Sequence, residues 1–87
     1  MKKLVQVAEV EDQGLESLLE EKVLLLCGNY FYSGRLIGVN DKYVLLDDAE
    51  IVYETGAWSD KAWKYAEKVS SPWRVATAAI ESYGKGK

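Results

Sequence analysis

The chain has no histidine and only one cysteine, and both shortages narrow the chemistry available to it. Histidine is the usual acid–base side chain near neutral pH and a common zinc ligand, and Cys27 alone cannot form an internal disulfide. The six serines therefore have no imidazole to activate them, and no carboxylate pair stands apart from its charged surroundings. We expect a non-enzyme that uses no cofactor or metal ion and resides in a thiol-reducing compartment.

Long apolar runs are also missing. No stretch approaches the roughly 18–20 apolar residues that span a bilayer. The first residues carry two lysines, Lys2 and Lys3, but no apolar segment of the secretory type follows them. These absences predict a cytoplasmic protein that makes no membrane contact.

Positive charge is scarce in most of the chain and concentrated in its last third. Residues 1–60 hold five Lys/Arg against twelve Asp/Glu, a balance of −7, whereas residues 61–87 hold six against two, a balance of +4, which leaves −3 overall. Because salt screens charge beyond about 8 Å, a basic final third can bind a polyanion locally despite the acidic body.

Apolar residues, by contrast, are abundant for so short a chain. Of the 87 residues 48% are hydrophobic, and ten are aromatic (three Trp, six Tyr and one Phe). A domain of this size buries only about 60–65% of its unfolded surface, so part of its apolar surface would remain exposed to water in a single chain. Shared burial between subunits is one way to cover it.

The order of local patterns predicts a single domain that is mainly β. Asp12 is a suitable N-cap, and three leucines at helical spacing follow it, whereas from Lys22 on short apolar runs alternate with polar turns. We expect a short N-terminal helix and then a strongly bent five-stranded antiparallel sheet that forms a small open barrel. The expected segments are an extension (1–11), the helix (12–21), three strands (22–55), a variable insertion (56–72), the last strands (73–83) and a flexible tail (84–87).

Residues 16–50 contain a pattern that runs from a turn through a bent strand to an acidic turn and an apolar strand with an acidic end: Asn29, Tyr32, Gly34, Leu36, Gly38, Asp41, Tyr43, Leu46, Asp47 and Asp48. This pattern resembles the first motif of the Sm/LSm family, which includes Hfq-type proteins. The resemblance implies an Sm-like, SH3-type barrel in which Gly34 and Gly38 are structural. It also implies a homo-oligomeric ring of about five to seven subunits that binds single-stranded RNA or DNA.

Four residues are the candidate nucleic-acid contacts. Asp41, Lys42 and Tyr43 lie in and after the acidic turn and offer a carboxylate, a cation and a stacking ring. Thr77 stands where the family's second motif has an Arg-Gly pair. The alternative for the three turn residues is an ordinary polar hairpin turn in which Tyr43 starts a strand.

Two differences from the family pattern favour a rival function. The Asn that usually follows the acidic turn is missing, and Ala76-Thr77 replaces the Arg-Gly pair. The rival is a protein-interaction or assembly module on the same barrel that has lost nucleic-acid binding. A more distant alternative is a small SH3-like or OB barrel that acts alone.

Three other features have structural interpretations that we favour. The cations and aromatics of residues 61–68 could form a single-strand platform, but Trp58 and Trp63 are better explained as packing residues. Asp47, Asp48 and Glu50 lack the further oxygen ligands of a hard-cation site. Cys27 ends an apolar run, which predicts core packing.

Overall fold

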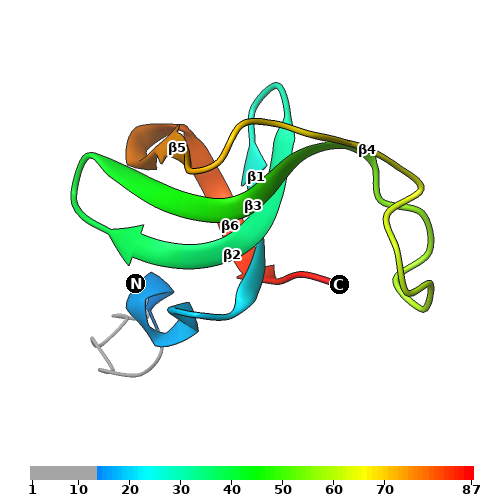
Figure 1. The fold of residues 1–87 in the computed structure, drawn as a ribbon, viewed down its shortest axis with the longest axis horizontal. Coiled ribbons are helices and arrows are strands. Elements are labelled where there is room, and N and C mark those ends of the chain that lie inside the picture. The colour runs from blue at the N-terminus through cyan, green and yellow to red at the C-terminus, as the bar shows by residue number, and fades with distance from the viewer. Residues whose placement is uncertain (1–13) are drawn as a thin grey trace, which may run out of the picture.

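The computed structural model describes residues 14–87. In chain order the elements are η1 (Leu15–Leu18), β1 (Lys22–Cys27), β2 (Phe31–Val39), β3 (Tyr43–Glu54), β4 (Tyr65–Lys68), β5 (Trp73–Ala76), η2 (Thr77–Ala79) and β6 (Ile80–Lys85), as Figure 1 shows. The expected mainly β, antiparallel fold is confirmed, although it has six strands and not five. No helix within residues 14–87 is long and apolar enough to cross a membrane.

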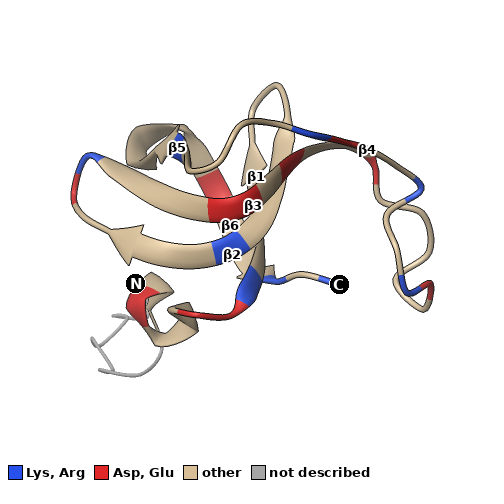
Figure 2. Cartoon of the chain, viewed as in Figure 1, with Lys and Arg blue, Asp and Glu red and all other residues tan. Residues whose placement is uncertain are grey.

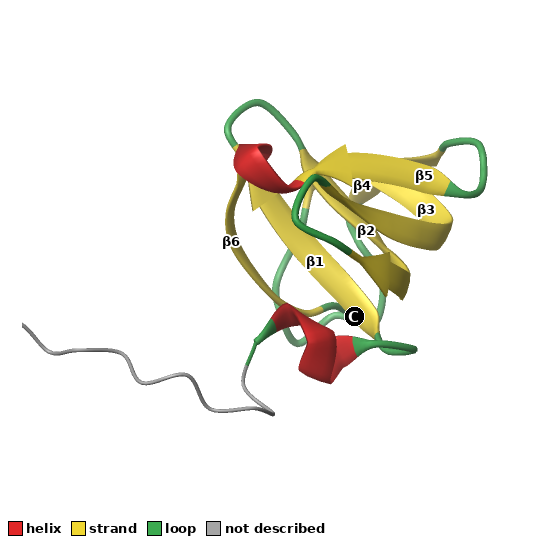
Figure 3. Cartoon of the chain, turned by 90° about the vertical axis from the view of Figure 1, so that its left-hand side faces the viewer, coloured by secondary structure: helices red, strands yellow, loops and turns green. Residues whose placement is uncertain are grey.

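All six strands belong to one antiparallel sheet with the order β4-β3-β2-β1-β6, in which β5 also pairs with β3. The long strand β3 pairs with β5 through its first residues, 43–46, and with β4 through its last, 50–54. β6 returns to pair with β1 at the other side of the sheet (Figure 3). The sheet is not closed, because no pairing between β5 and β6 is found among the described residues.

Two irregularities bend the β2–β3 pair. Between the partners Ser33↔Glu50 and Arg35↔Asp47, the two residues Asp48 and Ala49 lie opposite the single residue Gly34. Asp48 takes a positive φ of 53°, which is typical of a bulge residue. The second shift lies between Leu36 and Gly38. Bulges of this kind increase local twist and let a sheet curl.

The two glycines of β2 differ in the space around them. A Cβ added to Gly34 would lie 3.0 Å from the Asp47 carbonyl oxygen and 3.1 Å from the Ala49 Cα, both of which are backbone atoms. A Cβ added to Gly38 would meet only the Leu45 side chain, at 3.4 Å. The close approach of two backbones therefore excludes a side chain at position 34 but leaves room for one at position 38.

The core lies on the concave side of the sheet and follows the period of two that strands impose. Val23, Leu25 and Cys27 of β1 point into it, and strands β2, β3 and β5 complete it together with η1. The remaining buried members are Leu15, Leu36, Val44, Leu46, Ala49 and Val75. Cys27 is buried as expected. Burial raises the pKa of its thiol, and the negative charge of the nearby Glu81 raises it further.

The helix expected over residues 12–21 is not found in the part that the structure describes. Residues 15–18 form a single 3-10 turn, while the extension (1–11) and the first residues of the expected helix lie outside the described residues. The backbone leaves the helical path because Glu20 N–H donates to the Leu36 carbonyl at 2.7 Å and Leu36 N–H donates to the Glu21 carbonyl at 2.9 Å. Pairing with β2 thus replaces the helical hydrogen bonds that the leucine spacing predicts.

Residues 84–86, which the sequence predicts to belong to a flexible tail, pair with β1. β6 extends to Lys85, which lies opposite Val23, and Gly86 N–H donates to the Lys22 carbonyl at 2.8 Å. The free edge of β1 supplies these hydrogen-bond partners, and they order a Gly-Lys-Gly-Lys sequence that has no tendency of its own to form a strand.

Candidate nucleic-acid interface

The β2–β3 turn is organised by Asn40. Its side-chain oxygen accepts hydrogen bonds from the backbone N–H of Lys42 at 2.7 Å and of Tyr43 at 2.8 Å. Asn40 N–H in turn donates to the Tyr43 carbonyl at 3.0 Å. Such Asx turns hold a tight reversal without glycine. Asp41 and Lys42 are consequently exposed at the tip of the turn, next to the half-buried Tyr43.

Thr77 contacts the same turn, although it follows Lys42 by 35 positions in the chain. Its N–H donates to the Lys42 carbonyl at 2.9 Å, and its hydroxyl donates to the Asn40 carbonyl at 3.2 Å. These bonds fasten η2 to the turn. The structure therefore brings all four predicted contact residues, Asp41, Lys42, Tyr43 and Thr77, to one place.

Sequence reasoning did not identify Arg74, which belongs to this group. Arg74 lies in β5, where Trp73 and Val75 point inward and Arg74 points outward, and its guanidinium carbon is 5.5 Å from the centre of the Tyr43 ring. It takes part in none of the ion pairs found among the described residues. The alternation Trp-Arg-Val-Ala indicates that Arg74 points outward from a strand, but only the β3–β5 pairing shows that it faces the Tyr43 ring.

We call this surface the turn platform, and it consists of Asp41, Lys42, Tyr43, Arg74 and Thr77. Figure 2 shows the paired blue and red colour at the tip of the β2–β3 turn, away from the acidic segment of β3. Two cations against one carboxylate give the turn platform a net charge of +1, in contrast to the −3 of the whole chain. An aromatic ring beside two cations is the combination that binds a base and its phosphate.

Two of the three cations of residues 61–68, Lys64 and Lys68, lie near carboxylates of the same chain. Lys64 is 3.8 Å from Glu54, and Lys68 pairs with Asp48 at 2.7 Å, which raises the pKa of Lys68. The Trp63 ring packs edge to face against Trp58 with centroids 5.7 Å apart. Trp63 is half-buried, in agreement with the packing interpretation, whereas Trp58 remains 63% exposed and is not a core residue.

The carboxylates in the second half of β3 form ion pairs with cations of the same chain. Asp47 accepts from Arg35 at 2.6 Å and from the Ser71 hydroxyl at 2.6 Å, and these two bonds lower the pKa of its carboxyl. Asp48 pairs with Lys68, and Glu50 lies 3.8 Å from Lys22. Among residues 14–87 no group of three or more carboxylate or thiol side chains could hold a metal ion.

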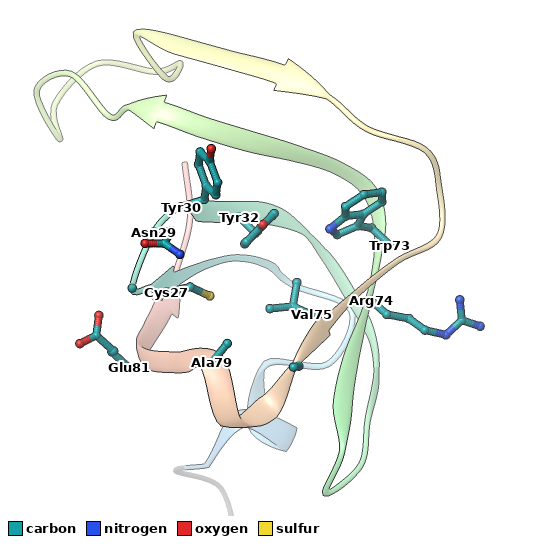
Figure 4. Close-up of a pocket in the computed structure, with 11 residues that line it drawn as sticks. Cys27, Asn29, Tyr30, Tyr32, Trp73, Arg74, Val75, Ala79 and Glu81 are labelled. Carbon is teal, nitrogen blue, oxygen red and sulfur yellow. The ribbon is translucent and has the colours of Figure 1, made fainter.

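A hollow of about 580 Å³ opens between the β1–β2 turn, β5 and η2 (Figure 4). Cys27, Tyr32, Trp73 and Val75 form its apolar floor, and Glu81 stands at its rim, whereas Arg74 points away from it. The hollow lies where β5 and β6 fail to meet. It offers an apolar surface to another chain and no obvious recognition of a phosphate.

Neither a protein-family description, nor a curated protein, nor a solved structure matches this chain.

Proposed function

We propose that this chain is an Sm-like open barrel that assembles into a homo-oligomeric ring and binds single-stranded RNA, or single-stranded DNA, without catalysis. The observation that carries the binding proposal is the turn platform, where Lys42, Tyr43 and Arg74 converge from two elements. Support for the barrel comes from the strong bend of the sheet and from a 3-10 turn that precedes a three-strand meander.

Binding on the turn platform combines stacking with backbone attraction. Base stacking on an aromatic ring is worth about 1–3 kcal/mol per base and tolerates every base. Repetition of Lys42 and Arg74 around a ring would set several cations along one strand, and the local potential then matters more than net charge. We expect sequence-tolerant binding that weakens as salt rises, because bound phosphates release counterions.

The test is fluorescence anisotropy of labelled oligo-U and oligo-A strands at several salt concentrations. Tyr43→Ala should weaken binding by about tenfold or more, from the lost stacking. Lys42→Ala and Arg74→Ala should weaken it and also flatten its salt dependence. Lys85→Ala is the matched control, because Lys85 is exposed and takes part in no ion pair among the described residues.

Two results would contradict this placement. If Tyr43→Ala leaves binding intact while Trp63→Ala with Lys64→Ala removes it, the site lies on residues 61–68 and the turn platform is not the interface. If no strand binds even at low salt, the second candidate function replaces the first.

That second candidate is a protein-interaction or assembly module on the same barrel. The hollow beside β5 favours it, because its volume of about 580 Å³ and its floor of Tyr32, Trp73 and Val75 suit an apolar side chain of a partner. Trp73→Ala should then abolish assembly while it leaves the turn platform unchanged.

A further inference from the structure

Lys87 places its ammonium inside a set of acceptors that the β3–β4 loop provides. Its Nζ donates to the carbonyl oxygens of Thr55 at 2.6 Å, Ala57 at 2.7 Å and Ala62 at 3.3 Å. The same nitrogen is 4.9 Å from the ring centre of Trp63 and 5.7 Å from that of Trp58. We call these three carbonyls and two rings the ammonium cage.

The loop backbone is shaped for this arrangement. Carbonyls two residues apart in an extended strand are separated by roughly 6.6–6.8 Å. At that separation one ammonium could not lie 2.6 Å from the Thr55 oxygen and 2.7 Å from the Ala57 oxygen at once. Gly56, between Thr55 and Ala57, adopts a φ of 73°, a conformation that side-chain-bearing residues rarely take, and this turn brings the two carbonyls together. A Cβ there would also lie 3.2 Å from Lys64 Cβ.

The two tryptophans complete the cage in a way that packing alone does not explain. Their planes meet at 81°, so the Lys87 ammonium faces both rings. Trp58 nevertheless remains 63% exposed, the highest value among the large hydrophobic residues of the described chain. A ring held open to solvent beside a cation is the arrangement found where aromatic residues recognise a cationic ligand.

The geometry selects a primary ammonium. A lysine ammonium carries three N–H donors, and the cage presents three acceptors. A quaternary ammonium has no N–H to donate, and a guanidinium is a planar fork that does not match three convergent carbonyls. We propose that residues 55–64 form a binding site for the unmodified lysine side chain of a partner protein, which Lys87 occupies within the same chain until the partner displaces it.

The surroundings of the cage indicate the sequence around such a lysine. A hollow of about 310 Å³ adjoins it, and Lys22, Lys61 and Lys64 line this hollow together with Glu50. Lys22 lies 3.8 Å from Glu50 and Lys64 lies 3.8 Å from Glu54, whereas Lys61 takes part in no ion pair among the described residues. An acidic residue next to the incoming lysine would meet Lys61, whereas Lys87 follows the uncharged and basic residues Gly84-Lys85-Gly86. The site shares no residue with the turn platform, so this proposal does not depend on nucleic-acid binding.

The first test measures tryptophan fluorescence of Lys87→Gln, in which the cage is vacant, during titration with n-butylammonium. We expect binding at least about tenfold tighter than to the wild-type protein, in which Lys87 competes. Lys85→Gln is the matched control, because it removes a lysine two residues away that lies outside the cage, and it should behave as wild type. N,N,N-trimethylbutylammonium should bind Lys87→Gln much more weakly than n-butylammonium.

Equal binding of n-butylammonium to Lys87→Gln and Lys85→Gln would overturn the proposal, as would equal binding of the two ammonium probes. A loop that loses its order in Lys87→Gln is recognised by its shifted emission, and saturating n-butylammonium should restore the wild-type spectrum. Failure of that rescue also contradicts the proposal.

The second test uses the wild-type protein and two peptides, Glu-Gly-Lys-Gly-Glu and its lysine-acetylated form. The unmodified peptide should change tryptophan emission and speed proton exchange of the Lys87 ammonium, measured by nitrogen-15 NMR, whereas the acetylated peptide should do neither. Identical behaviour of the two peptides, or a Lys87 ammonium that exchanges as fast as that of Lys85 before any peptide is added, would refute the lysine site.

Discussion

At the scale of single residues, Gly34 and Gly38 differ in what surrounds them, and this difference can be measured. Gly34→Ala forces a Cβ to within 3.0 Å of the Asp47 carbonyl oxygen, so we expect a loss of about 1–3 kcal/mol in the free energy of unfolding. Gly38→Ala meets only a side chain at 3.4 Å and loses unfolded-state freedom, so it should be neutral or stabilise by up to about 1 kcal/mol. Chemical denaturation of both variants checks this, and equal effects would show that the strands do not approach closely at position 34.

Ser33 is a second residue with a distinct expectation. It is fully buried, and its hydroxyl has no hydrogen-bond partner among residues 14–87. A buried hydroxyl without a partner costs free energy, whereas a methyl group of similar size does not. Ser33→Ala should therefore leave the midpoint of chemical denaturation unchanged or raise it. A loss above about 1 kcal/mol would mean that the hydroxyl is bonded in solution.

At the scale of elements, Arg35 of β2 joins two separate segments. Its guanidinium donates to Glu20, just before β1, at 2.7 Å and to Asp47 of β3 at 2.6 Å. Figure 2 shows the basic segment of β2 directly beside the acidic segment of β3. The Ser71 hydroxyl bonds the second oxygen of Asp47, so the carboxylate also ties the β4–β5 connection to β3.

This network predicts a pH dependence. The hydrogen bond from Ser71 and then that from Arg35 hold the pKa of Asp47 below its usual value. Its contribution to stability is therefore complete above the unfolded-state pKa of about 3.9 and disappears as the pH falls through the lower folded-state pKa. The difference in Tm between wild type and Asp47→Asn should be constant above about pH 5 and shrink toward pH 2.

Asp60→Asn serves as the control for that measurement, because Asp60 is exposed and takes part in no ion pair among the described residues. Its Tm should follow that of wild type at every pH. A difference between wild type and Asp47→Asn that persists unchanged to pH 2 would show that the charge of Asp47 does not stabilise the fold.

At the scale of the whole molecule, the open side of the sheet is the expected site of assembly. β5 and β6 each pair with a neighbour on one side only, and unpaired edges of this kind favour strand addition. Pairing of β5 in one copy with β6 in the next would satisfy both edges and cover the hollow beside Trp73. Light scattering at micromolar concentration should give about 50–70 kDa, against 9.8 kDa for one chain.

Charged residues on both edges should prevent this assembly. The double variant Ala76→Lys with Ser82→Lys sets like charges on β5 and β6, and we expect it to be monomeric with an unchanged circular dichroism spectrum. Ser59→Lys, in the exposed β3–β4 loop, should keep the mass of the wild type. A wild-type protein that is monomeric at this concentration would end the ring proposal.

Much of the element order could be predicted from local sequence, because local chemistry decides it. The apolar run Val23–Cys27 and the polar turns at Gly28-Asn29 and Asn40–Lys42 mark three antiparallel strands, and the structure has them there. The predicted contact residues Asp41, Lys42 and Tyr43 follow from the same turn, since neighbours in a chain stay neighbours in space.

Contacts between distant segments could not be predicted from local sequence. The leucines at 15, 18 and 19 have helical spacing, yet pairing of residues 20–21 with Leu36 replaces the helix with a 3-10 turn. Arg74 reaches Tyr43, and Lys87 reaches the carbonyl of Thr55, only because β5 and β6 return to opposite sides of the sheet. These contacts join residues 15 to 32 positions apart, and their gain appears only after the strands have come together, so no local pattern could predict them.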